Sequence, residues 1–513
     1  MLPRPRTSSC LAVLALAAFA PQADAQLIPI KTLPIAEGDQ FRIFPSANVG
    51  MAGVSIALPD SLLDPFANPA HGGRALRGAT SARFGGAPTF YSLSRDAGGG
   101  QTLPLSALAR RGAYFGGVSL AIQEIDRVGE RVTPLPVPLF ASDGSPITLG
   151  IEEPSRQNHY AFAMLGREMA ERGLAIAASV LWSGLNDVDG TELLYAGSQR
   201  IEQHGGILDL RLGVTKSWRD GQTLEALLLH NRYAMTHDVT WLDPFWDPNL
   251  RGMQLRVRPE RNRDLTNTWG MQLEYARPLA DSAWRLGLHA TTNLMSHPHL
   301  PEYQIERVNV IPWDPGYSDA HNLGVGVARV LGPTTFGVDA VFEPIRSHTW
   351  GEAQQPIHTE RGVVVPAGGR TTENWFRFRN AILRAGIGQE IPIDSGATRL
   401  RLQLGMALHS INYALRQHDH VTDRTRRQRE SWTEWTRTWG LGLHFASLEL
   451  RYVGLQTTGT GRPGIPSGEV FFATPDAALA TGGRNILSAP SGPLTLTGVR
   501  MMTHQVSVSL PLR

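Results

Sequence analysis

The chain has 513 residues, of which 42% are hydrophobic and 18% are charged. Its 48 basic and 46 acidic side chains nearly cancel, so the charge gives no reason to expect nucleic acid as a partner. Cys10 is the only cysteine and falls in a predicted leader, which excludes a disulfide framework, a thiolate metal site and a cysteine nucleophile from the mature protein.

The N-terminus has the pattern of a secretory signal peptide. Two arginines precede an apolar stretch at residues 11–20, and Ala23-Asp24-Ala25 forms a small-residue cleavage site. Residues 1–25 are therefore predicted to be a signal peptide. Beyond them no run approaches the roughly 18 apolar residues of a transmembrane helix. Any membrane crossing by this chain is therefore predicted to use strands.

The next region, residues 26–78, is irregular. Residues 26–45 are predicted to be a periplasmic lead-in. Glycines and prolines then interrupt residues 46–70, and because Gly permits positive φ while Pro fixes φ and lacks a donor, compact turns are expected there. Such a segment needs walls around it, which favours a plug folded inside a barrel formed by residues 79–513.

The same stretch carries a family resemblance. Gly50-Met51-Ala52-Gly53, an acidic turn at Asp60 and then Asn68-Pro69-Ala70 resemble the N-terminal hatch of the FadL-like superfamily of outer-membrane transporters, which includes PorV-type secretion proteins. The resemblance implies a fourteen-stranded barrel and a ligand pocket bordered by the hatch. The candidate hatch and pocket residues are Gly50, Met51, Gly53, Asp60, Phe66, Asn68, Pro69 and Ala70. An ordinary Asn-Pro turn after a Gly-rich segment is the alternative.

Alternation of apolar and polar residues dominates the rest of the chain. Leu208, Leu210 and Leu212 oppose Asp209 and Arg211. The same period-2 pattern recurs near residues 269–277, 284–291, 399–409, 448–452 and 504–513. Successive strand side chains face opposite sides, so each segment has one apolar and one polar face. A soluble sandwich would show this too, but strand lengths near 10 to 14 residues and tryptophans at strand ends favour a membrane barrel.

Short turns alternate with long links along the predicted barrel. The long links are predicted at His237–Asp264, Ser296–Ser318 and Arg346–Thr372. Outer-membrane barrels place short turns in the periplasm and long loops outside, with an even number of strands. Counting hairpins gives about sixteen strands, against the fourteen that the resemblance implies. The predicted fold is all-β: a transmembrane antiparallel β-barrel of 14–16 strands with an N-terminal plug, or hatch, in its lumen.

Local motifs give no indication of catalysis. Gly324-Val325-Gly326 lacks the third glycine of a dinucleotide fingerprint, and no P-loop, HExxH or G-x-S-x-G motif occurs. The pairs His297/His299 and His418/His420 offer two imidazoles each, where a metal site needs three or four ligands. We therefore predict no catalytic, cofactor or metal site and no enzyme, although a hydrolase built from scattered barrel residues stays open.

Aromatic residues in the predicted outer loops are candidates for a vestibule where a hydrophobic molecule lands. They are Trp241, Phe245, Trp246 and Trp313. The alternative is that they cap the loops or anchor an interface. Arginines at 256, 258, 261 and 263 and at 424, 426, 427 and 429 either contact lipopolysaccharide phosphates or are solvated loop charges. Outer-membrane lipid and lipopolysaccharide are thus the expected surroundings of the barrel.

The leading functional hypothesis is passive uptake of hydrophobic small molecules, such as long-chain fatty acids, gated by the hatch. The family resemblance implies an exit through an irregular wall strand, and Gly116-Gly117 is the candidate kink, unless these glycines only ease curvature. Mixed-sign lumen charges are predicted to fasten strands or the plug rather than select ions. The rival is a PorV-like barrel that binds secreted proteins at the surface; a general porin is disfavoured by the plug.

Overall fold

The computed structural model describes most of the predicted barrel and two pieces of the region before it. The described residues are 46–58, 68–76, 81–93, 99–126, 156–188, 200–247, 252–279, 283–297, 303–305, 308–311, 316–353, 355–359, 361–394, 398–445, 447–460 and 499–512. The predicted signal peptide and lead-in lie outside them.

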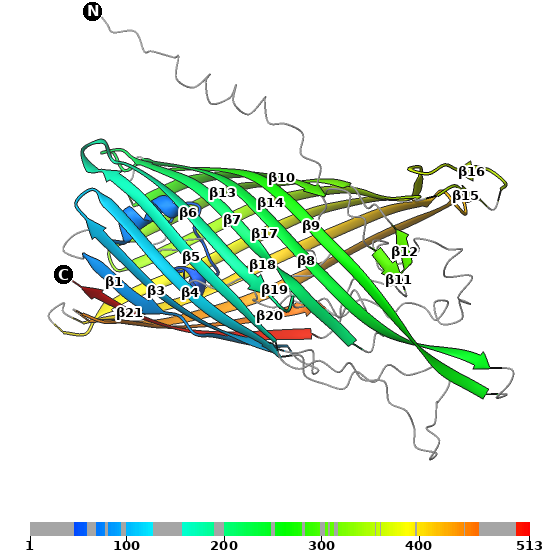
Figure 1. Ribbon diagram of the computed structural model, residues 1–513. Helices are drawn as coiled ribbons and strands as arrows, with labels where there is room; N and C mark the ends of the chain where they lie inside the picture. The colour runs from blue at the N-terminus through cyan, green and yellow to red at the C-terminus, as the bar shows by residue number, and fades with distance from the viewer. Residues whose placement is uncertain are drawn as a thin grey trace, which may run out of the picture.

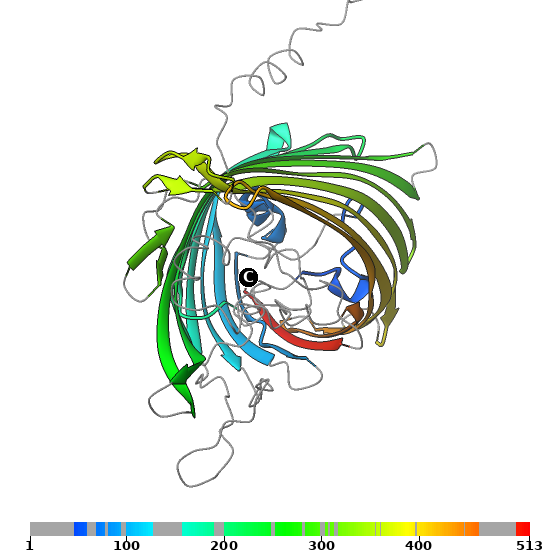
Figure 2. The same cartoon turned by 90° about the vertical axis from the view of Figure 1, so that its right-hand side faces the viewer.

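A closed antiparallel sheet of sixteen strand positions forms the wall (Figures 1 and 2). The first position is shared by β1 (Ala82–Gly86) and β2 (Thr89–Leu93). The others are β3 (Gly99–Arg111), β4 (Tyr114–Asp126), β5 (Arg156–Met169), β6 (Leu174–Leu185), β7 (Arg200–Ser217), β8 (Thr223–Asp247), β9 (Gly252–Pro278), β10 (Trp284–His297), β13 (Gly316–Leu331), β14 (Thr334–Glu352), β17 (Arg370–Pro392), β18 (Arg399–Asp419), β19 (Arg424–His444), β20 (Glu449–Thr460) and β21 (Val499–Leu512).

The barrel closes where its first and last strands meet. Ala82 of β1 pairs with Leu512 of β21, and the same register continues through β2, so the sheet has no free edge. Between β1 and β2, Pro88 lacks an N–H and interrupts the ladder, although its carbonyl still accepts from Val506 at 2.9 Å. The predicted count of sixteen is thereby confirmed, and the fourteen implied by the resemblance is wrong for this chain.

The predicted faces of the strands are confirmed. Leu208, Leu210 and Leu212 are 39–48% exposed on the outside, whereas Asp209 between them is 5% exposed. The last strand behaves alike, with Val506, Leu510 and their alternate neighbours outward. An apolar outer face over a polar inner face is the arrangement of a barrel in lipid. Polar inner residues also pair as expected: Arg211 donates to Asp209 at 2.6 Å, and Arg451 pairs with Glu449.

Connections differ at the two ends of the barrel. Short turns join β3 to β4, β7 to β8 and β13 to β14, and the 3-10 turn η5 (Ala170–Arg172) joins β5 to β6, all at the end where β1 begins and β21 finishes (Figure 1). At the other end lie the extra short strands β11 (Tyr303–Ile305), β12 (Val308–Ile311), β15 (Ile357–His358) and β16 (Val364–Val365). By the rule for outer-membrane barrels, we call the first end periplasmic and the second end outer.

The predicted link His237–Asp264 is wrong. This stretch is a strand hairpin in which β8 runs to Asp247 and β9 starts at Gly252. The reason is that opposite charges continue the pairing beyond the apolar zone: Arg261 lies opposite Asp238 and donates to it at 2.6 Å. The other two predicted links are shorter than expected because β10 extends to His297 and β14 to Glu352.

None of the helices among the described residues is long and apolar enough to cross a membrane.

We expect a charged substitution on the outer face of the wall to destabilise the barrel by an amount that depends on its depth in the bilayer. Leu120 in β4 is 65% exposed, and Leu120→Arg should destabilise the barrel by about 2–4 kcal/mol if it lies near the bilayer midplane. Val363, in the outer hairpin, is almost equally exposed at 64%, so Val363→Arg is a matched control. Urea unfolding in lipid vesicles measures both; equal effects would contradict this assignment of the lipid zone.

Candidate functional site

Two pieces of chain before the barrel lie against its inner wall (Figure 2). We call residues 46–58 and 68–76 together the inner segment. The first piece turns through η3 (Val49–Met51), where Ala52 and Gly53 have φ of 59° and 71°. The second contains η4 (Pro69–His71) and α2 (Gly72–Ala75). Met51, Val54 and Ala70 have no exposed surface, so these pieces are packed rather than solvated.

Side chains of the wall bind the backbone of the first piece. The Thr438 hydroxyl donates to the Gly50 carbonyl and accepts from the Ala52 N–H, both at 2.9 Å. Gln403 donates to the Ala47 carbonyl at 3.1 Å. An irregular segment has no ladder of its own, so its buried backbone groups need such partners.

The second half of the first piece is held by charged residues. One Asp339 oxygen accepts from the N–H groups of Ser55 at 2.8 Å and Ile56 at 3.2 Å. Arg285 donates to the Ala57 carbonyl at 3.2 Å. Both residues thus bind the backbone of the first piece rather than its side chains.

Glycines on six strands allow this close approach. Added Cβ atoms would lie 2.0 Å from the Ile56 carbonyl oxygen at Gly287, and 2.5 Å from Met51 or Ala52 backbone atoms at Gly386 and Gly405. Other wall glycines that face the first piece are Gly324, Gly326, Gly337 and Gly440. The wall therefore presents backbone where the inner segment lies, because any side chain there would displace it.

The second piece binds the opposite arc of the wall. Asn68 caps η4 by accepting from the Ala70 N–H at 3.0 Å, and its amide donates to the carbonyls of Val214 and Ala226, each at 3.4 Å. His71 and Arg74 both pair with Glu225 of β8, Arg74 at 2.6 Å. Gly213 faces Asn68 so closely that a Cβ would lie 1.9 Å from its oxygen. The chain thus reaches from one side of the lumen to the other.

The structure separates the residues that the sequence grouped together. Gly50 and Met51 contact the β17–β20 side, with Gly53 in the same turn, while the second piece with Asn68, Pro69 and Ala70 contacts β5–β8. Asp60 and Phe66 lie outside the described residues. The wall partners Asp339, Gln403 and Thr438 were not predicted; a usable signal was the Gly-x-Gly spacing on inward positions, as in Gly324-Val325-Gly326.

An apolar patch lines the wall on the outer side of the inner segment. In β18 the inward positions that contact the first piece are Gln403 and Gly405, and the same face continues to Ile411, about 20 Å further along the strand. We call the following buried residues the inner apolar patch: Met295, Ile345, Phe378, Ile411, Tyr413 and Leu415, with Ala320 and Phe376 packed against them. Five adjacent strands contribute to it.

Polar side chains separate this patch from the inner segment. Asn380 of β17 is 5% exposed and donates to Glu343 at 3.0 Å, while its own oxygen has no hydrogen-bond partner among the described residues. His409 lies 3.8 Å from Glu434. A molecule passing from the patch to the inner segment would therefore meet hydrogen-bonding groups after an apolar surface.

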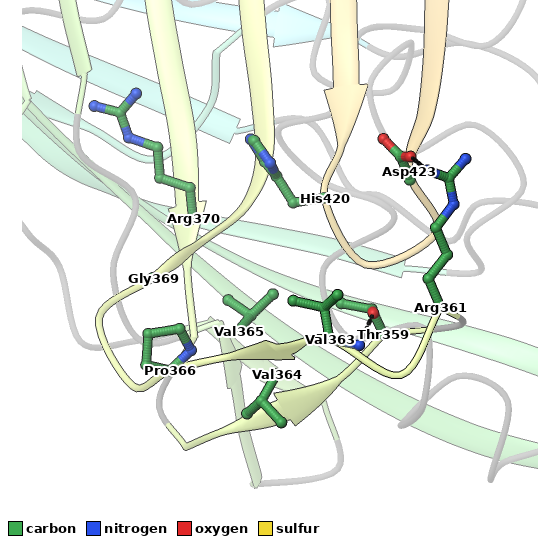
Figure 3. Close-up of a pocket in the computed structure, with 10 residues that line it drawn as sticks. All are labelled: Thr359, Arg361, Val363, Val364, Val365, Pro366, Gly369, Arg370, His420 and Asp423. Carbon is green, nitrogen blue, oxygen red and sulfur yellow. Dashed lines mark hydrogen bonds and ion pairs between the residues drawn. The ribbon is translucent and has the colours of Figure 1, made fainter.

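A hollow lies at the outer end, beside the β15–β16 hairpin (Figure 3). It has a volume of about 430 Å³, with Val363, Val365 and Pro366 on the hairpin side and Arg370 and His420 across from them. Its charges are mostly neutralised within the protein: Arg361 pairs with Asp423, and Arg370 with Glu373.

Glu373 contacts three basic side chains beside this hollow. It accepts from His420 at 2.9 Å and from His348 at 3.1 Å. Burial opposes ionisation of Glu373, but these hydrogen bonds and the Arg370 charge outweigh it and lower its pKa. Burial also lowers the pKa of His348, although Glu373 opposes this. Glu373 lies about 33 Å along β17 from the lipid-facing Leu383, outside the apolar zone.

The remaining predicted site residues divide into two groups. Trp241, Phe245 and Trp246 lie in β8 rather than in a loop, and their side chains, like Trp313 as a whole, lie outside the described residues. Gly116 and Gly117 lie in β4, whose pairing with β3 and β5 continues through them without a register shift. No described group of three or more His, Cys, Asp or Glu residues is arranged to hold a metal ion; His418 and His420 are 4.4 Å apart but contact Thr425 and Glu373.

The fold and its polarity define a transmembrane β-barrel of the outer-membrane type with chain packed in its lumen. No protein-family model and no curated protein matches the sequence. Among solved structures, the chain is similar to a Pseudomonas aeruginosa FadL homologue at 11% identity and a TM-score of 0.46, over 92% of this chain and 99% of that one. It is also similar to the toluene transporters TodX of Pseudomonas putida (10%, 0.38, 91% and 97%) and TbuX of Ralstonia pickettii (9%, 0.37, 93% and 99%).

We expect one added methyl group to displace the inner segment. Gly405→Ala places a Cβ against Met51 and Ala52, which should cost about 1–3 kcal/mol and raise hydrogen exchange at residues 47–57. Gly442→Ala is the matched control, because its Cβ would find ordinary contact at 3.4 Å. Unchanged exchange in the Gly405 variant would contradict the close packing described above.

The Glu373 contacts should weaken in acid. A carboxylate whose folded pKa is lowered stabilises the fold above its usual value of 4.5, and this stabilisation is lost as pH falls through the folded pKa. Protonation of His348 below its usual value of 6.5 is disfavoured in the folded state, which weakens stability in the same direction. Exchange protection of the β15–β16 hairpin should therefore fall in two steps, below pH 6.5 through His348 and again below pH 4.5 through Glu373. Glu373→Gln should remove the step below pH 4.5 and leave the His348 step in place; an unaltered profile below pH 4.5 would argue against a role for Glu373.

Proposed function

We propose that this protein is a passive outer-membrane pathway for hydrophobic small molecules, such as long-chain fatty acids, and that the inner segment acts as its hatch. The observation that carries the proposal is the inner apolar patch. The lumen of a water-filled barrel is polar, whereas this patch places eight apolar residues on adjacent strands facing inward. Its side chains suit a ligand that leaves water, because burying apolar surface is favourable without any covalent step.

The position of the patch supports a route from the outer end towards the inner segment. A ligand entering from outside would reach the patch first and the bound backbone of residues 47–57 afterwards. The free oxygen of Asn380 at the boundary suits a ligand with a donor at one end of an apolar body, such as a protonated carboxyl group. Tyr413 and two phenylalanines add aromatic surface that would also accept a ring.

The inner segment is proposed to control onward passage. Its two pieces bind different arcs of the wall through a small number of side chains, notably Thr438, Asp339 and Glu225. Release of either piece would change the lumen without breaking the barrel ladder. Gly116-Gly117 remains the proposed place of a lateral exit. The strand pairing through these glycines is regular in this structure, so the exit would require local opening of the pairing there.

A binding titration with a fluorescent fatty acid tests this function. Ile411 is 1% exposed, and Ile411→Asn should weaken saturable binding by about tenfold or more, because a buried aliphatic side chain contributes about 1.5–3 kcal/mol. Val363→Asn, in the outer hairpin, is the control and should leave binding unchanged. Asn68→Ala should alter the uptake rate into vesicles more than the affinity, since Asn68 lies on the inner segment.

Two outcomes would overturn the proposal. Heat-modifiable mobility on gels must first show that each barrel is folded. If the folded wild-type protein binds no apolar probe and carries no extracted lipid, the inner patch is structural packing. If it instead co-purifies with a secreted protein, the PorV-like alternative is favoured.

A further inference from the structure

The outer surface of the wall carries six exposed arginines close together near its outer end. They are Arg346, Arg377, Arg379, Arg416, Arg427 and Arg429, which we call the arginine patch. They lie on the adjacent strands β14, β17, β18 and β19. Each occupies a position with the same outward parity as lipid-facing Phe342, Leu383, Leu404 or Trp435 on its own strand.

Strand register brings like charges face to face in this patch. Arg346 is directly opposite Arg377, and Arg416 is directly opposite Arg427. Opposed residues of this kind have Cβ atoms about 4.5–5.5 Å apart, and like charges there are destabilising. Arg377 and Arg379 also follow each other on one face of β17. Such an arrangement is stable when an anion lies among the guanidinium groups.

The protein supplies few negative charges here. Arg416 stacks on Trp375 with its guanidinium carbon 4.9 Å from the ring centroid, and no described carboxylate forms an ion pair with any of the six arginines. Asp319 lies opposite Arg346 at the edge of the patch but is 3.1 Å from His321. Glu373, beyond the patch, is engaged by Arg370 and two histidines.

The patch also has a defined depth. Arg379 lies about 13 Å along β17 from Leu383, which is 48% exposed, so the guanidinium groups begin where the apolar outer face ends. Trp375 beside the patch and Trp435 below it are aromatic residues of the kind found at membrane interfaces. This is the level of lipid head groups in the outer leaflet.

We propose that the arginine patch binds the phosphate groups of a phosphorylated, multi-acyl glycolipid of the outer leaflet. Guanidinium groups bind phosphate through paired hydrogen bonds, and several together match a head group with more than one phosphate. The acyl chains of the same lipid would lie along Phe342 and Leu383. The site is thus formed by a continuous strip of the outer face, which is basic towards the outer end and apolar towards the periplasmic end.

Native mass spectrometry of the full protein purified in detergent tests this proposal, with diphosphorylated lipid A as the probe. The test variant is Arg377→Gln with Arg379→Gln. The matched control is Arg167→Gln with Arg277→Gln, which removes two exposed arginines at the periplasmic end. We expect the test variant to raise the midpoint of lipid binding by about tenfold or more while the control stays within about twofold, because only the first removes phosphate donors.

Two competitors separate the sources of the phosphate. Dephosphorylated lipid A should bind about tenfold more weakly, and binding of the intact lipid should fall with added salt, since the contact is electrostatic. Inorganic phosphate at equal concentration should not displace the lipid. The proposal is overturned if the test variant binds like wild type, if the dephosphorylated lipid binds equally, or if inorganic phosphate displaces the lipid. Arg416→Gln with Arg427→Gln repeats the test if the first variant does not fold.

Discussion

The close approach between the inner segment and the wall is the contact on which the lumen depends. The hydrogen bonds that hold residues 47–57 come from wall side chains, which reach this piece because neighbouring wall positions are glycine. Thr438, Gln403, Asp339 and Arg285 all bond to the segment's backbone. Recognition of the first piece therefore depends on its backbone shape more than on its side chains, whereas the second piece is bound through Asn68, His71 and Arg74. The wall glycines and four polar residues therefore define the site more strictly than the hatch motif does.

Polarity changes in opposite directions on the two faces of the wall. Towards the outer end, the outer face passes from apolar residues such as Leu383 to arginines, while the inner face passes from bonded polar residues to the inner apolar patch. Each change occurs where the surroundings of the wall change. On the outer face, the arginines lie at the level where we propose that lipid head groups follow the acyl chains. On the inner face, the inner apolar patch lies beyond the zone that the inner segment occupies. A single strand such as β17 carries both patterns because alternate residues face opposite sides.

Much of the wall could be predicted from the sequence, because alternation is a local signal. The faces of residues 208–212 and of the last strand, and the total of sixteen strands, follow from period-2 patterning and parity. The contacts of the inner segment could not be predicted in this way. Asp339 and Gly405 lie hundreds of residues from the segment they bind. Nothing in the neighbouring sequence distinguishes Gly405, where an added Cβ would clash, from Gly442, where it would make ordinary contacts. The β8–β9 hairpin does not follow from the local sequence, because its polar residues, prolines and aromatic residues are typical of a loop, although the Arg261–Asp238 pair extends the sheet there.

The inner segment also has a consequence for biogenesis. It precedes the barrel in the chain, yet its wall partners follow 146 to 388 residues later, and the sheet closes only when β21 reaches β1. Contacts over such separations are slow to form. Filling the lumen and sealing the cylinder are thus late steps that involve the first and last parts of the polypeptide. Loss of only the fourteen residues of β21 would leave two open sheet edges, so a truncated product would be unsealed and prone to quality-control degradation rather than a narrower version of the same barrel.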